Sequence, residues 1–82
     1  MGVNQVAALL VIKQLGVCRV SEVMEGIESN INVTSQLITN LVGKGLVEPV
    51  HQDRSIRYQI TKKGEKELRE IYSTEVLDKS SA

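Results

Sequence analysis

The hydrophobic pattern between Asn32 and Thr61 leaves few folds open to this chain, because it changes period halfway along. In the first half, the apolar residues recur at the spacing of one helix face. They are Val33, Leu37, Ile38, Leu41 and Val42. Gly43 and Gly45 follow, and glycine is the residue that most often ends a helix. We therefore expect a helix that stops at this pair of glycines.

The second half of this stretch is typical of a β-hairpin. Leu46 to Val50 and Arg57 to Thr61 have the composition of strands, and the charged segment from His51 to Ser55 lies between them as a turn. Pro49 has no backbone N–H to donate, so we expect it at an outward-facing position of an edge strand. A helix followed directly by a hairpin is suited to docking on a partner.

The outer face of the expected helix carries polar, uncharged side chains. Glutamine and asparagine can each form two hydrogen bonds with adenine, and serine and threonine can bond to several bases. The candidate base-reading residues are Thr34, Ser35, Gln36, Thr39 and Asn40. Residues of these types suit the major groove of double-stranded DNA.

Charge is distributed unevenly along the chain. The sequence has 10 basic and 10 acidic residues, and its formal net charge is zero. Between positions 44 and 63, however, five bases face only Glu48 and Asp53, a local balance of about +3. These bases, the candidates for contact with the DNA backbone, are Lys44, Arg54, Arg57, Lys62 and Lys63. Attraction to phosphate must come from this asymmetry, because the whole chain supplies none.

Two segments carry a resemblance to a known family. VTSQLITNLVGKGLVEP, followed by DRSIRYQITKKGEKEL, resembles the recognition helix, wing and next helix of winged helix-turn-helix transcriptional regulators of the MarR, ArsR and PadR kind. The resemblance covers roughly residues 4 to 72, and the chain is similar to small stand-alone regulators of archaea and their viruses. It implies an α+β fold that is mainly α, with a three-helix core, a β-hairpin wing and a C-terminal helix.

The resemblance also implies a partner and a mode of binding. The partner would be double-stranded DNA, with the recognition helix in the major groove and the wing on the minor groove or the backbone. The wing motif is compressed relative to MarR-type wings, because Arg54 directly follows Asp53 and Arg57 comes later. Which of the two arginines enters the minor groove therefore stays open. The alternative is a winged-helix protein-interaction module of replication, transcription or membrane-remodelling machinery. An exposed apolar patch on the helix or the wing would favour that alternative.

The segments before this stretch supply two further helices. Asn4 to Leu15 has the length and propensity of a helix, Val17 to Val20 is a short β-rich segment, and Ser21 is placed to cap a second helix. Either Asn30 or Asn32 can cap the recognition helix that follows.

The first and last helices predict a homodimer. The first helix is apolar on nearly all sides, so it is either wrapped by its own domain or half-covered by a second copy. The last helix, which Thr61 is placed to cap, carries a narrow apolar stripe. The expected interface residues are Val6, Leu9, Ile12, Leu68, Ile71, Tyr72 and Val76. Residues 1–78 would form one DNA-binding domain with this dimerisation helix, and residues 79–82 a frayed tail.

The sequence lacks the residue patterns of enzymes and metal sites. His51 is its only histidine and Cys18 its only cysteine, and it has neither a glycine-rich phosphate loop nor metal-ligand spacing. We therefore expect no catalysis and no cofactor, metal or small-molecule ligand. The single cysteine favours a reducing, cytoplasmic setting and a buried, inert thiol. The apolar run from Val6 to Ile12 is far too short to span a membrane.

Overall fold

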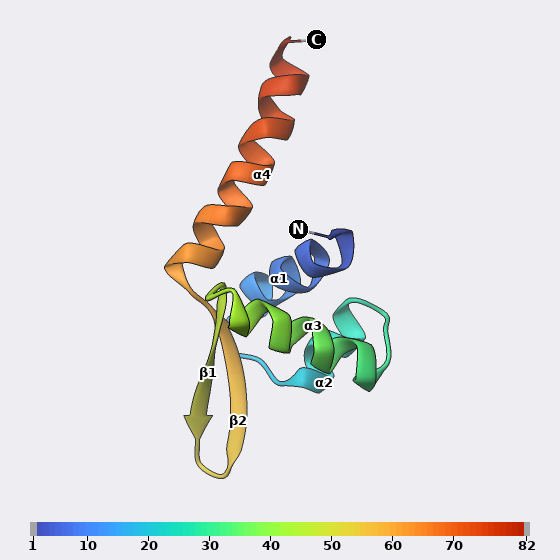
Figure 1. The fold of residues 1–82 in the computed structure, drawn as a ribbon, viewed down its shortest axis with the longest axis vertical. Helices are drawn as coiled ribbons and strands as arrows, with labels where there is room; N and C mark the ends of the chain where they lie inside the picture. Colours follow the sequence, from blue (N-terminus) through green and yellow to red (C-terminus); the bar gives the residue numbers. More distant parts are fainter. Residues whose placement is uncertain (1, 82) are drawn as a thin grey trace.

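The computed structural model describes the backbone of residues 2–81 and the side chains of residues 2–71. Within these residues the chain forms helices and one two-stranded antiparallel sheet, in the predicted winged-helix arrangement (Figure 1). In chain order the elements are α1 (Val3–Leu15), α2 (Val20–Gly26), α3 (Ile31–Gly43), β1 (Val47–Gln52), β2 (Ser55–Ile60) and α4 (Lys62–Ser81). Among the described residues, no helix is both long enough and apolar enough to cross a membrane.

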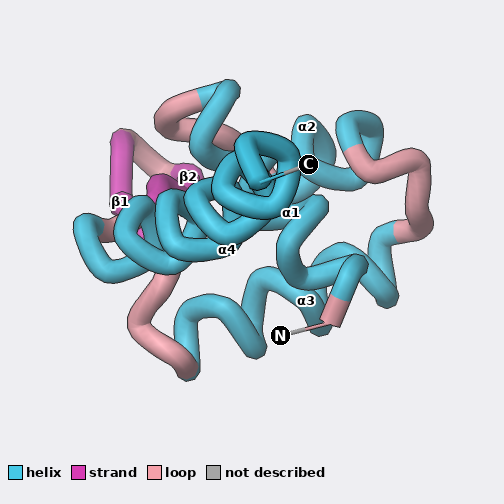
Figure 2. Tube along the Cα trace, turned by 90° about the horizontal axis from the view of Figure 1, so that it is seen from above, coloured by secondary structure: helices cyan, strands magenta, loops and turns pink. Residues whose placement is uncertain are grey.

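α1 lies at the centre of the fold. It packs against α2, α3, α4 and β2, and Figure 2 shows it between α2 on one side and α3 on the other. The hairpin and α4 leave this three-helix unit in opposite directions, as Figure 1 shows. The molecule is therefore elongated, with principal extents of 49 × 24 × 20 Å.

The core is built almost entirely from aliphatic side chains. α1 contributes Ala8, Leu9 and Ile12, each 0% exposed. The other buried members of the core are Cys18, Val23, Ile38, Leu41, Leu46, Val47 and Leu68. The expectation that Leu9, Ile12 and Leu68 lie in a dimer interface is therefore wrong, because the surrounding elements of one chain already bury them completely. Val6 packs partly buried against the same core.

The segment before α2 differs from its prediction. The expected strand at Val17 to Val20 is reduced to one bridge, in which the Cys18 N–H donates to the Tyr58 carbonyl at 2.9 Å and the Tyr58 N–H donates to the Cys18 carbonyl at 2.7 Å. α2 then begins at Val20, so Ser21 lies inside the helix and is not its cap. The chain turns into α2 as soon as Cys18 has paired with β2.

The start and end of α3 follow the local sequence. Asn30 Oδ1 accepts a hydrogen bond from the Val33 N–H at 2.9 Å, which selects Asn30 over Asn32 as the cap. α3 ends at Gly43, and Gly45 has a φ of +76°, a left-handed conformation that glycine adopts without strain. The glycine pair therefore ends this helix as predicted.

The wing hairpin is longer than predicted. β1 and β2 pair from Val47–Ile60 to Gln52–Ser55, so only Asp53 and Arg54 form the turn. Both backbone groups of Tyr58 bond to Cys18 on the side away from β1, which makes Pro49–Tyr58 a non-hydrogen-bonded pair. Pro49 therefore loses no ladder bond by lacking an N–H, as the sequence predicted.

Thr61 caps α4, because its Oγ1 accepts a hydrogen bond from the Gly64 N–H at 3.0 Å. Gly64 is buried against the turn that follows α3. A Cβ added there would overlap the backbone carbonyl of Leu46 and the side chain of Ile60. The first turn of α4 can lie so close to this turn only because residue 64 has no side chain.

Replacing Gly64 by alanine should therefore destabilise the fold by about 1–3 kcal/mol, since the backbone of Leu46 cannot move aside alone. Gly43→Ala is the matched control, because a Cβ there meets nothing within 4 Å and alanine is the better helix former. Urea unfolding of both variants measures the difference. Equal stabilities would contradict the close packing of α4 on this turn.

Candidate nucleic-acid interface

α3 presents an uncharged polar face to solvent. No residue of Ile31–Gly43 carries a charge, and Ser35, Gln36, Thr39 and Asn40 are all exposed, as expected. Gln36 and Asn40 are four residues apart, so their amide side chains lie one above the other on the same side of the helix. This face combines hydrogen-bond donors and acceptors without net charge, the chemistry that base edges match.

Asn32 extends this face by one turn. Its side chain is exposed, and it lies four residues before Gln36. Sequence reasoning considered Asn32 only as an alternative helix cap. Because Asn30 forms the cap, Asn32 belongs to the outer face, and its spacing from Gln36 was the signal that could have identified it.

Thr34 does not lie on the outer face of α3, where the sequence analysis placed it. It is 0% exposed, whereas Val33, expected inside, is 38% exposed. Thr34 precedes Ile38 by four residues and Leu41 by seven, so all three share the face that packs on the core. The Thr34 Oγ1 has no hydrogen-bond partner among the described residues. Thr34 is therefore not a base-reading residue. Its place on the core-facing side of α3 buries it although its side chain is polar.

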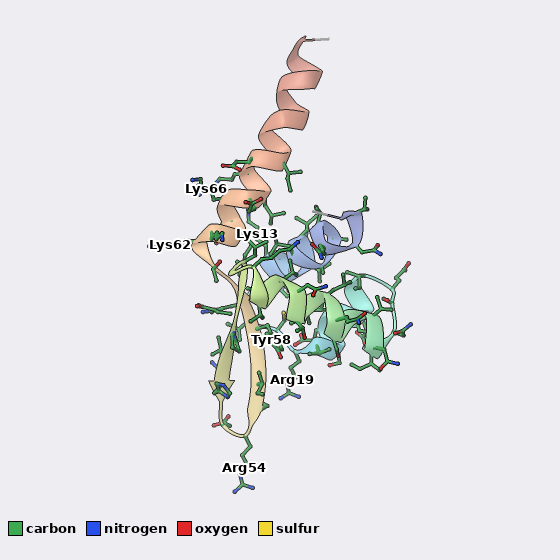
Figure 3. The ribbon with its side chains drawn as sticks, in the orientation of Figure 1. Lys13, Arg19, Arg54, Tyr58, Lys62 and Lys66 are labelled. Atoms are coloured by element: carbon green, nitrogen blue, oxygen red, sulfur yellow. The ribbon has the colours of Figure 1, made fainter. Side chains whose placement is uncertain are left out.

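The two arginines of the wing lie in different environments. Arg54 is exposed and projects from the tip of the hairpin (Figure 3). Arg57 pairs with Val50 across the strands and is half-buried, and its Nε is enclosed without a hydrogen-bond partner among the described residues. Arg54 is thus the wing arginine that reaches furthest into solvent.

The three lysines of the expected basic surface lie at the other end of the hairpin. Figure 3 shows Lys62 at the start of α4, far from Arg54 at the tip. Lys44 Nζ donates to Gln5 Oε1 at 2.7 Å, and Lys63 Nζ donates to the Lys44 carbonyl at 3.0 Å. A six-residue strand is about 20 Å long, beyond the Debye length of about 8 Å at physiological salt, so the two groups of cations act separately.

Arg19 is a cation near the wing that sequence reasoning missed. The backbone N–H of Arg19 donates a hydrogen bond to Glu22 Oε1 at 2.9 Å, and the Arg19 side chain is exposed. Figure 3 shows it projecting to the same end of the molecule as Arg54. No local signal marks Arg19, because its place follows from the bridge that ties the neighbouring Cys18 to β2.

Cys18 is a buried thiol with a structural environment. It is 0% exposed, and its Sγ donates to the Tyr58 carbonyl at 3.6 Å. Burial, and to a lesser extent the Glu22 carboxylate, raises the pKa of the Cys18 thiol above its ordinary value. A protonated, enclosed thiol is a poor nucleophile, which agrees with the inert role expected for it. The side chains described here include no cluster of three or more His, Cys, Asp or Glu that could hold a metal ion.

Comparison with known proteins identifies the fold. No protein-family model and no curated protein matches the sequence. A MarR-family protein from Bacillus stearothermophilus superposes with a TM-score of 0.90 at 22% identity, over 99% of this chain and 58% of that one. Bordetella bronchiseptica BpsR superposes with a TM-score of 0.85 at 18% identity, over 98% of this chain and 60% of that one. Its structure concerns regulation of DNA binding by 6-hydroxynicotinic acid.

A third similar structure contains nucleic acid. Streptococcus pneumoniae FabT in complex with DNA superposes with a TM-score of 0.80 at 19% identity, over 96% of this chain and 59% of that one. The present chain therefore has the winged-helix fold of MarR-family transcriptional regulators. It spans 58–60% of the length of these three structures.

Replacing Thr34 by valine should stabilise the fold by up to about 1 kcal/mol, because it removes a buried hydroxyl without a partner and keeps the side-chain shape. Thr39→Val is the matched control, since Thr39 is an exposed threonine on the same helix. Urea unfolding checks the stability, and a marked loss in Thr34→Val would contradict this account of the hydroxyl.

Proposed function

We propose that this protein is a sequence-specific, double-stranded DNA-binding transcriptional regulator and not an enzyme. α3 would enter the major groove, and the wing would lie on the minor groove or the phosphate backbone. The observation that carries the proposal is the exposed face of α3, which is uncharged and carries polar side chains from Asn32 to Asn40, with exposed Ile31 and Val33 near its N-terminal end. A major groove about 12 Å wide admits one such helix.

The chemistry of α3 supports base reading. Gln36 and Asn40 each offer an amide oxygen and an NH₂ group, so each can form two hydrogen bonds with adenine. Asn32 lies in line with them and adds a third amide. Gly43, the last residue of α3, lies on the same side of the helix as these amides. A Cβ there would meet nothing within 4 Å, so the fold itself does not require glycine at this position. Its small size would allow the backbone to approach a partner closely.

The cations near the wing supply the electrostatic part of the proposal. Arg54 at the tip and Arg19 at the start of α2 lie at the same end of the molecule, where they can contact phosphates on either side of the groove (Figure 3). Because the chain has no net charge, these local cations must provide the attraction. The DNA complex of one protein of the same fold and the ligand-regulated DNA binding of another support the assignment.

The proposed regulator is a homodimer joined through α1 and α4. Val3 is 86% exposed, and Ala7 and Leu10 are half-buried on the same outer side of α1. Ile71 of α4 is half-buried as well, while the side chains of Tyr72 and Val76 lie outside the described residues. α4 continues beyond α1 into solvent, where a second copy can pack on it (Figure 1). This interface uses the outer side of α1 instead of the buried Leu9 and Ile12.

Gln36→Ala and Asn40→Ala should each weaken binding to the preferred duplex by about 1–3 kcal/mol and change random-duplex binding little. Arg54→Ala should weaken all duplexes alike and lower the salt slope by about one unit. Site selection followed by salt titrations of each variant measures both effects. If both amide variants keep the ratio of specific to random binding, base reading by α3 is wrong and the protein-interaction alternative gains support.

Val3→Asp and Ile71→Asp should each shift the dimer towards monomer, because both introduce a charge into the proposed apolar interface. Ser21→Asp is the matched control, since it adds the same charge to an exposed position on α2. Sedimentation at tens of micromolar measures the mass. A wild-type chain that sediments as a monomer would contradict the dimer.

A further inference from the structure

The turn that follows α3 is held to the start of α4 by three successive carbonyl groups. The Lys44 carbonyl accepts from Lys63 Nζ at 3.0 Å, the Gly45 carbonyl from Thr61 Oγ1 at 2.7 Å, and the Leu46 carbonyl from the Thr61 N–H at 3.0 Å. We call this set of contacts the α3–α4 clasp. It spans the whole wing hairpin, because β1 and β2 lie between its two halves (Figure 1).

The clasp is packed as well as hydrogen-bonded. Gly64 lies so close to the Leu46 carbonyl that no other residue fits. On its other side, Lys44 Nζ donates to Gln5 Oε1 of α1 at 2.7 Å. The end of α3 is therefore tied to both helices of the proposed dimer interface.

The position of Lys63 has a physical reason within this clasp. A cation in the first turn of α4 opposes the dipole of that helix. Its ammonium group, however, lies on a carbonyl just past the C-terminal end of α3, where the dipole of α3 favours positive charge. Lys63 thus bonds to the end of α3 within the fold, and its phosphate contact stays a prediction from the sequence.

We infer that Lys63 is a positioning residue that fixes the angle between α3 and α4, and through it the spacing of the two α3 helices of a dimer on DNA. This inference rests on the proposed function. α4 has 20 residues, so it is a lever about 30 Å long. A change of about 10° at its base moves the far end by about 5 Å, more than one base-pair step of about 3.4 Å. The clasp lies at the base of this lever.

Lys63→Met keeps the side-chain stem and removes the donor, and Lys63→Arg restores a donor. Lys62→Met is the matched control, since Lys62 is an exposed neighbour that makes no hydrogen bond in the part of the chain that is described. Each variant is titrated on duplexes that carry two half-sites at a series of spacings. In Lys63→Met, the ratio of the affinity for the best half-site spacing to the affinity for other spacings should fall by about fivefold or more, while the salt slope stays unchanged. Lys63→Arg should recover this ratio.

Other outcomes would overturn the inference. A salt slope lowered by about one unit, with spacing discrimination intact, would make Lys63 a phosphate contact. A loss of discrimination that Lys62→Met shares would make the effect one of charge. Unchanged base specificity in the α3 variants, by contrast, contradicts the proposed function and leaves the spacing result of Lys63→Met to be judged separately.

A measurement without DNA tests the same inference even if no duplex is bound. Spin labels at Ser35→Cys and Arg69→Cys, both exposed, report the distance between α3 and α4, while the buried Cys18 stays unlabelled. Dilution with unlabelled chain keeps one labelled copy in each dimer. Lys63→Met should broaden or shift the distance distribution, and Lys63→Arg and Lys62→Met should not. An unchanged distribution in Lys63→Met would overturn the inference.

Discussion

The burial of one side of α1 positions the other three helices and β2 of this protein. Leu9 and Ile12 are 0% exposed, and α2, α3, α4 and β2 all pack on α1. Each such side chain stabilises the fold by about 1.5–3 kcal/mol, which is a large share for a chain of 82 residues. Because Ile38 and Leu41 must face this core, the amides of α3 are left on the opposite side. The candidate interface is thus a consequence of core packing.

Some cations of the basic stretch bond within the fold, and others are exposed to solvent. Lys44 and Lys63 donate hydrogen bonds within the fold, at 2.7 Å to Gln5 and at 3.0 Å to the Lys44 carbonyl. Arg54 remains at the wing tip, and the bridge between Cys18 and β2 brings Arg19 to the same end. The wing is consequently held firmly at its base, by the α3–α4 clasp, and is exposed at its tip. This arrangement fits a recognition element whose position relative to α4 is fixed.

Local sequence was sufficient to predict the element types and much of the candidate interface. Helical periodicity up to Gly43, followed by strand-like segments, predicted α3 and the wing, because these signals depend on residues close together in the chain. The caps Asn30 and Thr61 follow from the same short-range chemistry. The exposure of Gln36 and Asn40 was predicted as well, because both lie near the middle of the polar face, where a small rotation of the helix does not bury them.

Four placements required the folded chain. Thr34 is buried because packing on α1 fixes the rotation of α3, and its polarity alone indicated the opposite face. Lys63 bonds to a carbonyl 19 residues earlier, and Arg19 adjoins a bridge between residues 40 apart. The burial of Leu9 and Ile12, which removed them from the dimer interface, likewise requires elements from the rest of the chain. In each case the deciding contact joins residues distant in sequence, and local periodicity carries no information about such contacts.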